Sequence, residues 1–471
     1  MDYDLLIVGA GASGMFLAYE LKQLKTRQKV LMVDTGRPIH QRICPISAGK
    51  VNHCICCKPC NIMNGFGGAG TLSDGKYNLT TEFGGDLHRY VGQEKAMELM
   101  NYVDGVLCEY DHHQSKLFST ANSDLKTTAL RNDLHLLSAQ VRHFGTERNV
   151  EILKKMYEEI KDEIEIRFLT TVEKVNYLSS GFQAVFSTGE TVTAEKIVLA
   201  SGRSGSKWIG EICKQNGIRT KSNRVDIGVR IEIPAEVFKH ITDEVYESKI
   251  VYKTQKYNDM VRTFCMNPYG KVVAENTNGI ITVNGHSYAD KKLQTENTNF
   301  ALLVSNHFTD PFRDSNDYGE SIARLSNMLG GGVLLQRFGD LVKGRRSSER
   351  RMQKCFTRPT LKATAGDLSL VIPKRQLDDI IEMIYQLDKI APGMANEDTL
   401  LYGVEVKFYN SKVEVNKEFE TSKKGLYAIG DGSGITHSLS QASANGVYLA
   451  KILENITPTR SEERRVGKEC R

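Results

Sequence analysis

The first 35 residues carry the pattern that most constrains the fold of this chain. Residues 4–9 form an apolar run that predicts a buried parallel strand, and residues 15–25 place apolar side chains at helical spacing. Residues 29–34 predict a second short strand. The glycine-rich loop Gly9-Ala10-Gly11-Ala12-Ser13-Gly14 joins the first strand to the helix. This order predicts a strand–helix–strand unit of a Rossmann-type α/β fold.

The glycines of that loop have separate physical roles in such a unit. They allow the tight turn, let the backbone approach a pyrophosphate, and seat the helix against the sheet. The free N–H groups of the helix then face the phosphate, and an acid ending the second strand can accept hydrogen bonds from a ribose. A glycine-rich turn in another kind of α/β sheet is the alternative. We predict a dinucleotide site that includes Gly9, Gly11, Ala12, Ser13, Gly14 and Asp34.

A second motif lies near the other end of the chain. Residues 424–434 predict a short strand that leads into Gly430, Asp431 and a glycine turn, and residues 438–453 predict a helix. This stretch resembles the C-terminal motif of FAD proteins of the glutathione-reductase superfamily. The resemblance implies that Asp431 binds the ribityl chain and that the start of the helix, with Gln441 and Ala442, lies at the flavin.

Two further stretches resemble the same superfamily. Residues 196–204 are similar to its strand-to-glycine segment beside FAD, which implies that Ser201 and Gly202 lie at the cofactor. Residues 182–193 predict a hairpin that turns at Thr188-Gly189 and resembles the small β-meander inserted there. Val172 would belong to the strand on the adenine side. Together these motifs imply FAD as the cofactor.

Other stretches resemble a bacterial family of FAD-dependent, or NAD(FAD)-utilising, dehydrogenases. They include Gly67-Gly68-Ala69-Gly70-Thr71, for which the resemblance implies that Gly68, Gly70 and Thr71 lie along FAD. One departure is His286, where the family leads us to expect an apolar residue. The remaining stretches are residues 226–232, 261–270, 284–287, 336–340, 358–361 and 428–434.

The expected architecture is an α/β fold with a discontinuous Rossmann-type FAD-binding domain and an inserted β-rich substrate domain. We assign residues 1–85, 130–222 and 355–457 to the FAD domain, 86–129 to a helical cap, and 223–354 to the substrate domain. Residues 458–471 form a polar tail that we interpret as disordered or foreign to the natural protein. Since no second G-x-G-x-x-G follows a later strand, NAD(P)H would dock transiently, or another donor would supply electrons.

Several polar residues are candidates for chemistry near the flavin. His437 lies at the start of the C-terminal helix and is either a source of protons or positive charge, or a capping residue. Cys265 and His286 lie in loop-like segments of the substrate domain, where a structural role is the alternative to catalysis. The arginines could bind a carboxylate substrate, or merely pair with neighbouring acids: Arg230, Arg262 and Arg358.

A cysteine-rich stretch precedes the second glycine run. Cys54, Cys57 and Cys60 have C-x-x-C-x-x-C spacing, which brings three thiolates to one iron–sulfur cluster, and Cys44 is a candidate fourth ligand. A zinc site, a redox disulfide between Cys57 and Cys60, and inert thiols are the alternatives.

Charge and hydropathy limit the partners. A net charge of +5 over 471 residues is small, so we expect no nucleic-acid partner. No stretch has the apolar length of a membrane span, and the acidic N-terminus is unlike a signal peptide, so we expect a cytoplasmic protein without membrane contact. The prediction is an FAD-dependent oxidoreductase that acts on a small organic molecule. An FAD-dependent RNA-modifying protein and a flavin or cysteine redox sensor are the alternatives.

Overall fold

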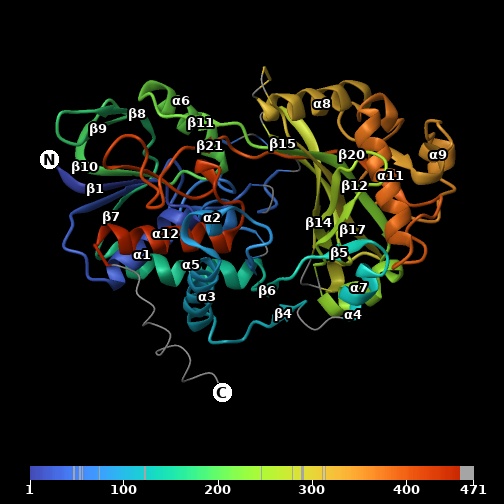
Figure 1. Cartoon of the computed structure of the whole chain (residues 1–471), viewed down its shortest axis with the longest axis horizontal. Coiled ribbons are helices and arrows are strands. Elements are labelled where there is room, and N and C mark those ends of the chain that lie inside the picture. The colour runs from blue at the N-terminus through green and yellow to red at the C-terminus, as the bar shows by residue number, and fades with distance from the viewer. Residues whose placement is uncertain are drawn as a thin grey trace. The chain divides into compact units, whose positions relative to one another are not determined.

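The computed structural model divides into two compact units. It describes residues 1–45, 48–51, 55, 57–73, 75–120, 124–245, 247–277, 279–287, 291–309, 311–312 and 314–456. Unit 1 contains residues 1–116, 142–221 and the chain from residue 410, and unit 2 contains residues 117–141 and 222–409. The colour gradient in Figure 1 shows that each unit combines segments that lie far apart in the sequence.

A largely parallel sheet forms the centre of unit 1. Its strand order is β7-β2-β1-β10-β9-β8, and β22 also pairs with β10. Strands β7, β2, β1, β10 and β22 are parallel, whereas β8, β9 and the first half of β10 form an antiparallel meander. Their bounds are β1 Tyr3–Val8, β2 Val30–Val33, β7 Glu165–Arg167, β8 Val172–Tyr177, β9 Phe182–Phe186, β10 Thr191–Leu199 and β22 Leu426–Ala428. The strands predicted at residues 4–9 and 29–34 and the hairpin at 182–193 are confirmed.

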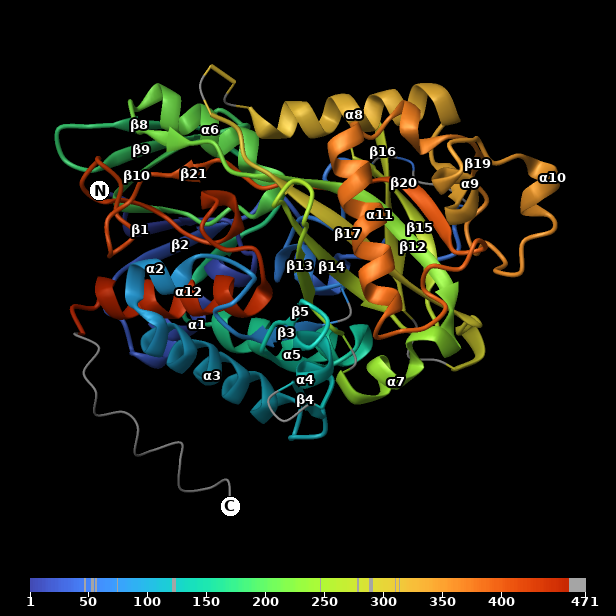
Figure 2. The same ribbon diagram turned by 45° about the vertical axis from the view of Figure 1, so that its right-hand side comes forward.

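The helices of unit 1 cover this sheet. α1 and α12, both predicted from the sequence, lie against each other (Figures 1 and 2), and a Cβ at Gly446 would come within 2.1 Å of the Ser13 carbonyl oxygen. That glycine therefore permits the close approach of the two helices. The helices are α1 Ala12–Gln23, α2 Leu87–Val91, α3 Gln93–Tyr110, α5 Thr146–Lys161, α6 Ser206–Gln215 and α12 Leu439–Leu453, and the shorter strands are β3 Lys76–Leu79, β11 Thr220–Lys221 and β21 Lys412–Val413.

A mostly antiparallel sheet forms the centre of unit 2, in the order β19-β18-β20-β12-β17-β14-β13-β5. The hairpin of β15 and β16 is paired separately. The strands are β4 Leu117–Ser119, β5 Leu134–Leu136, β12 Val225–Pro234, β13 Ile250–Lys253, β14 Met260–Asn267, β15 Lys271–Thr277, β16 Ile280–His286, β17 Asn297–Asn306, β18 Leu334–Arg337, β19 Thr364–Ala365 and β20 Leu400–Lys407; β6 Gln140–His143 spans the unit boundary. The helices are α4 Asp124–Leu130, α7 Ala235–Val245, α8 Ser315–Gly330, α9 Phe338–Val342, α10 Glu349–Met352 and α11 Lys374–Asp388.

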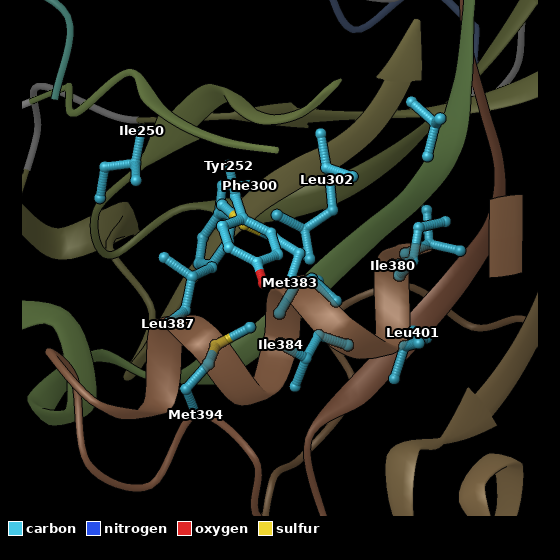
Figure 3. Close-up of a cluster of buried hydrophobic side chains, with 14 of the residues drawn as sticks. Ile250, Tyr252, Phe300, Leu302, Ile380, Met383, Ile384, Leu387, Met394 and Leu401 are labelled. Carbon is cyan, nitrogen blue, oxygen red and sulfur yellow. The ribbon is translucent and has the colours of Figure 1, made fainter. Parts of the chain in front are cut away.

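The main core of unit 2 lies between this sheet and its helices. Figure 3 shows Met383, Ile384 and Leu387 of α11 pointing toward Phe300 and Leu302 of β17. Strand β12 contributes alternate residues to this core, namely Val225, Ile227, Val229, Ile231 and Ile233. Its intervening residues, which include Asp226, Arg230 and Glu232, are also buried. The strand therefore carries an apolar face and a polar face, and both are covered.

The expected domain boundaries are wrong in three places. Residues 355–409 were assigned to the FAD domain but belong to unit 2, because β20 hydrogen-bonds with β12 and β18. Residues 130–141 also belong to unit 2, where β5 pairs with β13. The expected cap at 86–129 is not one helical element: α2 and α3 belong to unit 1, and α3 contacts α12. Periodicity identifies strands and helices but not their partners. The tail at 458–471 lies outside the described residues.

Among the described residues, no helix is both long enough and apolar enough to cross a membrane.

One buried acid opposes the stability of unit 2. Asp379 of α11 has no exposed surface. Burial raises its pKa to about 7, and the nearby Asp259 carboxylate, which pairs with Arg375 at 2.5 Å, adds to the rise, whereas Thr254 opposes it. An acid whose pKa is higher in the folded chain lowers stability progressively as pH rises from its unfolded pKa, about 3.9 for Asp, to its folded pKa, because folding must then take up a proton.

We therefore expect Asp379→Asn to stabilise the protein more at pH 8 than at pH 5. The gain should grow by about 1–3 kcal/mol over this range, because the wild-type chain must release a buried proton that the amide variant lacks. Thermal melting at the two pH values measures the effect.

The neighbouring acid provides the matched control. Lys256 and Lys374 pair with Asp378, and these cations and Tyr257 outweigh partial burial and lower its pKa to about 2. Asp378→Asn should lose the same stability at pH 5 and pH 8, since this group is ionised at both. An Asp379→Asn effect that is equally independent of pH would contradict the assignment.

Candidate functional site

The carboxyl ends of four parallel strands meet at one edge of the unit 1 sheet. Gly9 follows β1, Asp34 follows β2, Ser201 follows β10 and Gly430 follows β22. Backbone hydrogen bonds join these ends: Gly9 N to Val33 O at 2.8 Å, Ala200 N to Val8 O at 2.8 Å, and Ile429 N to Leu199 O at 3.0 Å. The structure thus brings together the segments that the sequence predicted to form one site. Open α/β sheets bind ligands at this kind of edge.

The three glycines of the first loop differ in what the protein requires of them. Gly9 has a φ of +112°, and a Cβ there would lie 2.6 Å from the Ala200 carbonyl oxygen. A Cβ at Gly14 would lie 2.0 Å from the Gly9 carbonyl oxygen, so this residue lets α1 contact the end of β1. Gly11 has an ordinary φ of −70°, and the nearest atom to a Cβ there is 3.9 Å away. Nothing within the described protein demands a glycine at position 11, which is where a pyrophosphate would need the space.

Asp34 connects this loop to a second one. Its Oδ2 accepts a hydrogen bond from Ala10 N at 2.8 Å, and its Oδ1 accepts from Gly36 N at 2.7 Å and Gly65 N at 2.8 Å. The predicted ribose contact stays a prediction. The structure adds a role that the motif did not suggest, since one carboxylate holds three backbone segments together.

The second loop, residues 61–71, contains the predicted Gly68, Gly70 and Thr71. Gly67 N donates to Ala10 O at 2.8 Å, and a Cβ at Gly68 would lie 2.9 Å from the Gly11 Cα. Asn149 of α5 donates to the carbonyl oxygens of Gly70 and Thr71 at 2.9 and 3.0 Å. The glycine run therefore lies directly beside the first loop.

Arg42 organises the same loop from inside. Its side chain is buried and donates to the carbonyl oxygens of Phe66 and Ile62 at 2.6 and 2.7 Å and to Thr71 Oγ1 at 2.6 Å. Burial lowers the pKa of Arg42 to about 10, while Asp34 and Cys60 act in the opposite direction. Neither Arg42 nor Asn149 belongs to a recognisable motif, so sequence reasoning missed both.

The start of α12 completes the site. Ser438 caps the helix by accepting from Gln441 N at 3.3 Å, Thr436 donates to Asp431 Oδ1 at 2.8 Å, and Gly430 N donates to Asn445 Oδ1 at 3.0 Å. The cap leaves other N–H groups of the first turn available to an anion. Ala442 lies in the second turn and is buried.

Gln441 is engaged by the protein itself. Its amide donates to Thr80 O at 3.2 Å and Phe83 O at 3.0 Å and accepts from Leu87 N at 3.3 Å. It thus holds residues 80–87 against α12, and its direct contact with flavin stays a prediction.

Several buried polar atoms around this edge lack a partner among the described residues. They are Ser201 Oγ, Ser440 Oγ, Ser443 Oγ and Asn445 Nδ2. Buried polar groups without a hydrogen bond are costly, so a polar ligand at this edge would relieve that cost. These atoms and the open position at Gly11 fit a dinucleotide.

The predicted catalytic residues fall in both units. His437 of unit 1 is half-buried, and its backbone N–H donates to Gly84 O at 2.8 Å. Cys265 and His286 belong to unit 2, where Cys265 has a φ of +47° and His286 is exposed at the end of β16. Val172 begins β8, and Gly202 follows Ser201. Catalytic roles for His437, Cys265 and His286 stay predictions.

Two of the candidate arginines, Arg230 and Arg262, are bound by acids. Arg230 is fully buried and forms two hydrogen bonds of 2.7 Å with Glu405, and also donates to Cys265 O and Asn284 Oδ1. Arg262 pairs with Asp226 at 2.5 Å. Burial would raise the pKa of Asp226, but Arg262 and Arg224 lower it to about 2.

Arg358 is exposed and donates to Gln353 O at 3.0 Å. These contacts favour the ion-pairing alternative for Arg230 and Arg262 over direct binding of a substrate carboxylate.

The cysteine-rich stretch is only partly described. Cys44, Cys57 and Cys60 are free and half-buried, and Cys54 lies outside the described residues. Across the part of the chain that the structure describes, no group of three His, Cys, Asp or Glu side chains is arranged to hold a metal ion. The predicted four-cysteine site stays a prediction, since one of its ligands is not described.

Comparison with known families agrees with FAD as the cofactor. Residues 224–408 match the model of a family described as "FAD-dependent protein, C-terminal domain-like". A Clostridium beijerinckii protein described as an "Uncharacterized protein" is 26% identical over 96% of this chain and 81% of its own length.

Two solved structures also align with the chain at low similarity. Glycine oxidase from Geobacillus kaustophilus is 11% identical and covers 97% of this chain and 98% of its own, with a TM-score of 0.39. Iminodiacetate oxidase from a Chelativorans species is 11% identical and covers 96% of each chain, also with a TM-score of 0.39. The family match and the geometry of the unit 1 edge together support FAD as the cofactor and oxidoreductase as the class of this enzyme.

We expect Gly11→Val to fold but to lose FAD, because the side chain would fill space that the protein leaves open. Occupancy should fall at least about tenfold. Flavin absorbance per chain after purification, with the melting temperature, measures both properties.

Two other glycines serve as controls. Gly14→Ala should prevent folding, because its Cβ would overlap the Gly9 carbonyl oxygen. Gly210→Ala, where nothing lies within 4 Å, should change neither property. Full FAD occupancy in Gly11→Val would show that the phosphate lies elsewhere.

Proposed function

We propose that this chain is an FAD-dependent oxidoreductase of the glutathione-reductase type that moves a hydride or an electron pair between the flavin and a small organic substrate. The proposal rests on the space beside Gly11. No described protein atom requires a glycine there, so an external group beside the first loop accounts for the small residue. The matched family is described as FAD-dependent, which supports the same cofactor. The resemblance to FAD-dependent dehydrogenases supports the dehydrogenase or reductase direction.

The residues at the sheet edge would hold FAD in parts. The loop from Gly9 to Gly14 and the start of α1 would bind the pyrophosphate, with Asp34 fixing the loop and Gly68 to Thr71 closing it from the other side. Asp431, held by Thr436, would accept a hydrogen bond from a hydroxyl of the ribityl chain. When bound, FAD supplies the two-electron chemistry of its ring.

The protein's contribution near the ring would be electrostatic. The N-terminal turn of α12 is a source of N–H groups and a positive dipole end, which stabilise negative charge on a bound group. His437 stands directly before that helix and can hold a proton. Asp86, which pairs with Lys412 and Arg89, has its pKa lowered by these cations and by His437 despite partial burial. The dipole end of α12 and the cations at Asp86 would make this end of the site favourable for negative charge.

The sequence contains no second dinucleotide motif, which leaves two sources of electrons open. NAD(P)H would dock transiently, or another donor would reduce the flavin. Steady-state turnover with either nicotinamide nucleotide supports an enzyme, whereas a flavin that is reduced once and then stays inactive with every small-molecule acceptor supports the redox sensor.

We expect anaerobically purified protein to contain FAD that denaturation releases, because no covalent link is apparent in the sequence. The absorption spectrum of the filtrate after denaturation measures it. Flavin that remains with the precipitated chain would contradict non-covalent binding, and a chain without flavin would contradict the proposed function.

The cysteine-rich stretch provides a separate test. If Cys54, Cys57 and Cys60, with Cys44, ligate a cluster or zinc, replacing any one by serine should remove most of the metal and largely spare FAD. A redox disulfide would make Cys57 and Cys60 sensitive and leave Cys54→Ser nearly silent. Iron, zinc and acid-labile sulfide per flavin are the measurements. Stoichiometric flavin without metal or sulfide would exclude the metal site.

A further inference from the structure

One segment of unit 2 has a higher net positive charge than the whole chain. Residues 337–362 include nine Lys or Arg and two Asp or Glu, a formal charge of +7, whereas the chain totals +5. All other residues together therefore sum to −2. We call residues 337–362 the basic segment. Such a local concentration of charge creates a field that attracts anionic partners.

Most of the cationic side chains of the basic segment are exposed to solvent. Figure 2 shows α9, α10 and their connecting loops at the margin of unit 2. Seven of the nine cationic residues are exposed, and the exposed ones are Lys343, Arg345, Arg346, Arg350, Lys354, Arg358 and Lys362.

A buried acid keeps the basic segment ordered. Asp340 has no exposed surface and binds Ser347 Oγ and Arg345 Nε, each at 2.8 Å. Burial opposes ionisation, but these hydrogen bonds and Arg337 hold the pKa of Asp340 below its usual range. Gln336 Nε2 also donates to Arg345 O at 2.9 Å. The surface is therefore pre-organised, which reduces the entropy lost when a partner binds.

Most of the exposed cations have no acidic neighbour. Arg345 pairs with Asp340, and Lys343 pairs with Glu397 at 2.5 Å. For the other five exposed cations, the described residues provide no acidic oxygen within 4 Å. Their charge is available to a partner.

An aromatic ring stands among these charges. The side chain of Phe356 is 79% exposed and lies in the chain between Lys354 and Arg358. Its backbone N–H donates to Asp398 Oδ2 at 2.7 Å, so its position is fixed although the ring is free. An exposed phenyl ring offers a flat apolar face on which a nucleic-acid base can stack.

We propose that the basic segment binds single-stranded nucleic acid. The Arg and Lys side chains would bind successive phosphates, and Phe356 would stack on an unpaired base. The exposed ring favours a strand with accessible bases over a duplex or an acidic protein. This proposal is independent of the proposed FAD chemistry, and it opposes the expectation drawn from the small net charge of the whole chain.

The test uses full-length, FAD-loaded protein and a fluorescein-labelled oligouridine RNA of about 20 nucleotides, which exceeds the usual site size of a single-strand binding domain. Fluorescence anisotropy over a series of KCl concentrations gives the affinity and its salt dependence. We expect the variant Arg346→Glu/Arg350→Glu/Lys354→Glu to bind at least about tenfold more weakly. Its salt slope should fall by about 2, because three phosphate contacts are lost.

A charge-matched control separates this site from general electrostatics. Lys214→Glu/Lys221→Glu/Lys253→Glu makes the same change in net charge at exposed positions outside the basic segment and should bind within about threefold of wild type. FAD content and melting temperature should be unchanged in both variants. Equal weakening by the two variants, or no binding by the wild-type protein near physiological salt, overturns the proposal.

Phe356→Ala tests the nature of the partner. It should weaken RNA binding at least about fivefold and leave heparin binding unchanged, because heparin offers negative charge but no bases. Equal effects on RNA and heparin, equal affinity for duplex RNA, or preferential binding of poly-glutamate would overturn single-stranded nucleic acid as the partner.

Discussion

The geometry of the unit 1 site depends on one carboxylate that binds three backbone segments. Asp34 accepts from Ala10, Gly36 and Gly65, and no other described side chain connects these three segments directly. Hydrogen bonds to a charged acceptor are worth more than neutral ones, typically about 1.5–3 kcal/mol each. The two glycine loops are otherwise joined through backbone contacts such as Gly67 N to Ala10 O. The space at Gly11 exists only while these loops keep their separation, so the phosphate site depends on an acid that need not touch the phosphate.

The sequence predicted the strands, helices and loops at this edge because their pattern is local. The strand before Gly9, the helix after Gly14 and the acid at Asp34 lie within 35 residues, and each follows from spacing and residue type. The C-terminal motif succeeded for the same reason, since Asp431 lies between a short strand and a helix whose bounds match the prediction. Arg42 and Asn149 were not predicted, and Gln441 was predicted as a neighbour of the flavin but not for its contacts with residues 80–87. They contact backbone carbonyl or N–H groups far along the chain, and no residue pattern encodes such partners.

The domain boundaries were wrong for a related reason. The strand at 400–407 pairs with β12, and the two strands lie about 170 residues apart in the chain. Arg230 and Arg262 were candidates for binding a carboxylate substrate. The structure instead provides Glu405 and Asp226 as partners. A buried guanidinium without an acid would be costly, so the fold itself accounts for these arginines.

The net charge of a whole chain can conceal a strongly charged local surface. Over the whole chain, +5 is too small to suggest a polyanionic partner, yet residues 337–362 alone carry +7. Evenly spread like charges are screened beyond about 8–10 Å at physiological salt, whereas clustered ones act together on a partner that spans them. Clustering also costs stability through mutual repulsion. Asp340 offsets part of that cost for Arg337 and Arg345 from beneath the surface. One buried acid thus offsets part of the repulsion within the basic segment, much as Asp34 joins two glycine loops in unit 1.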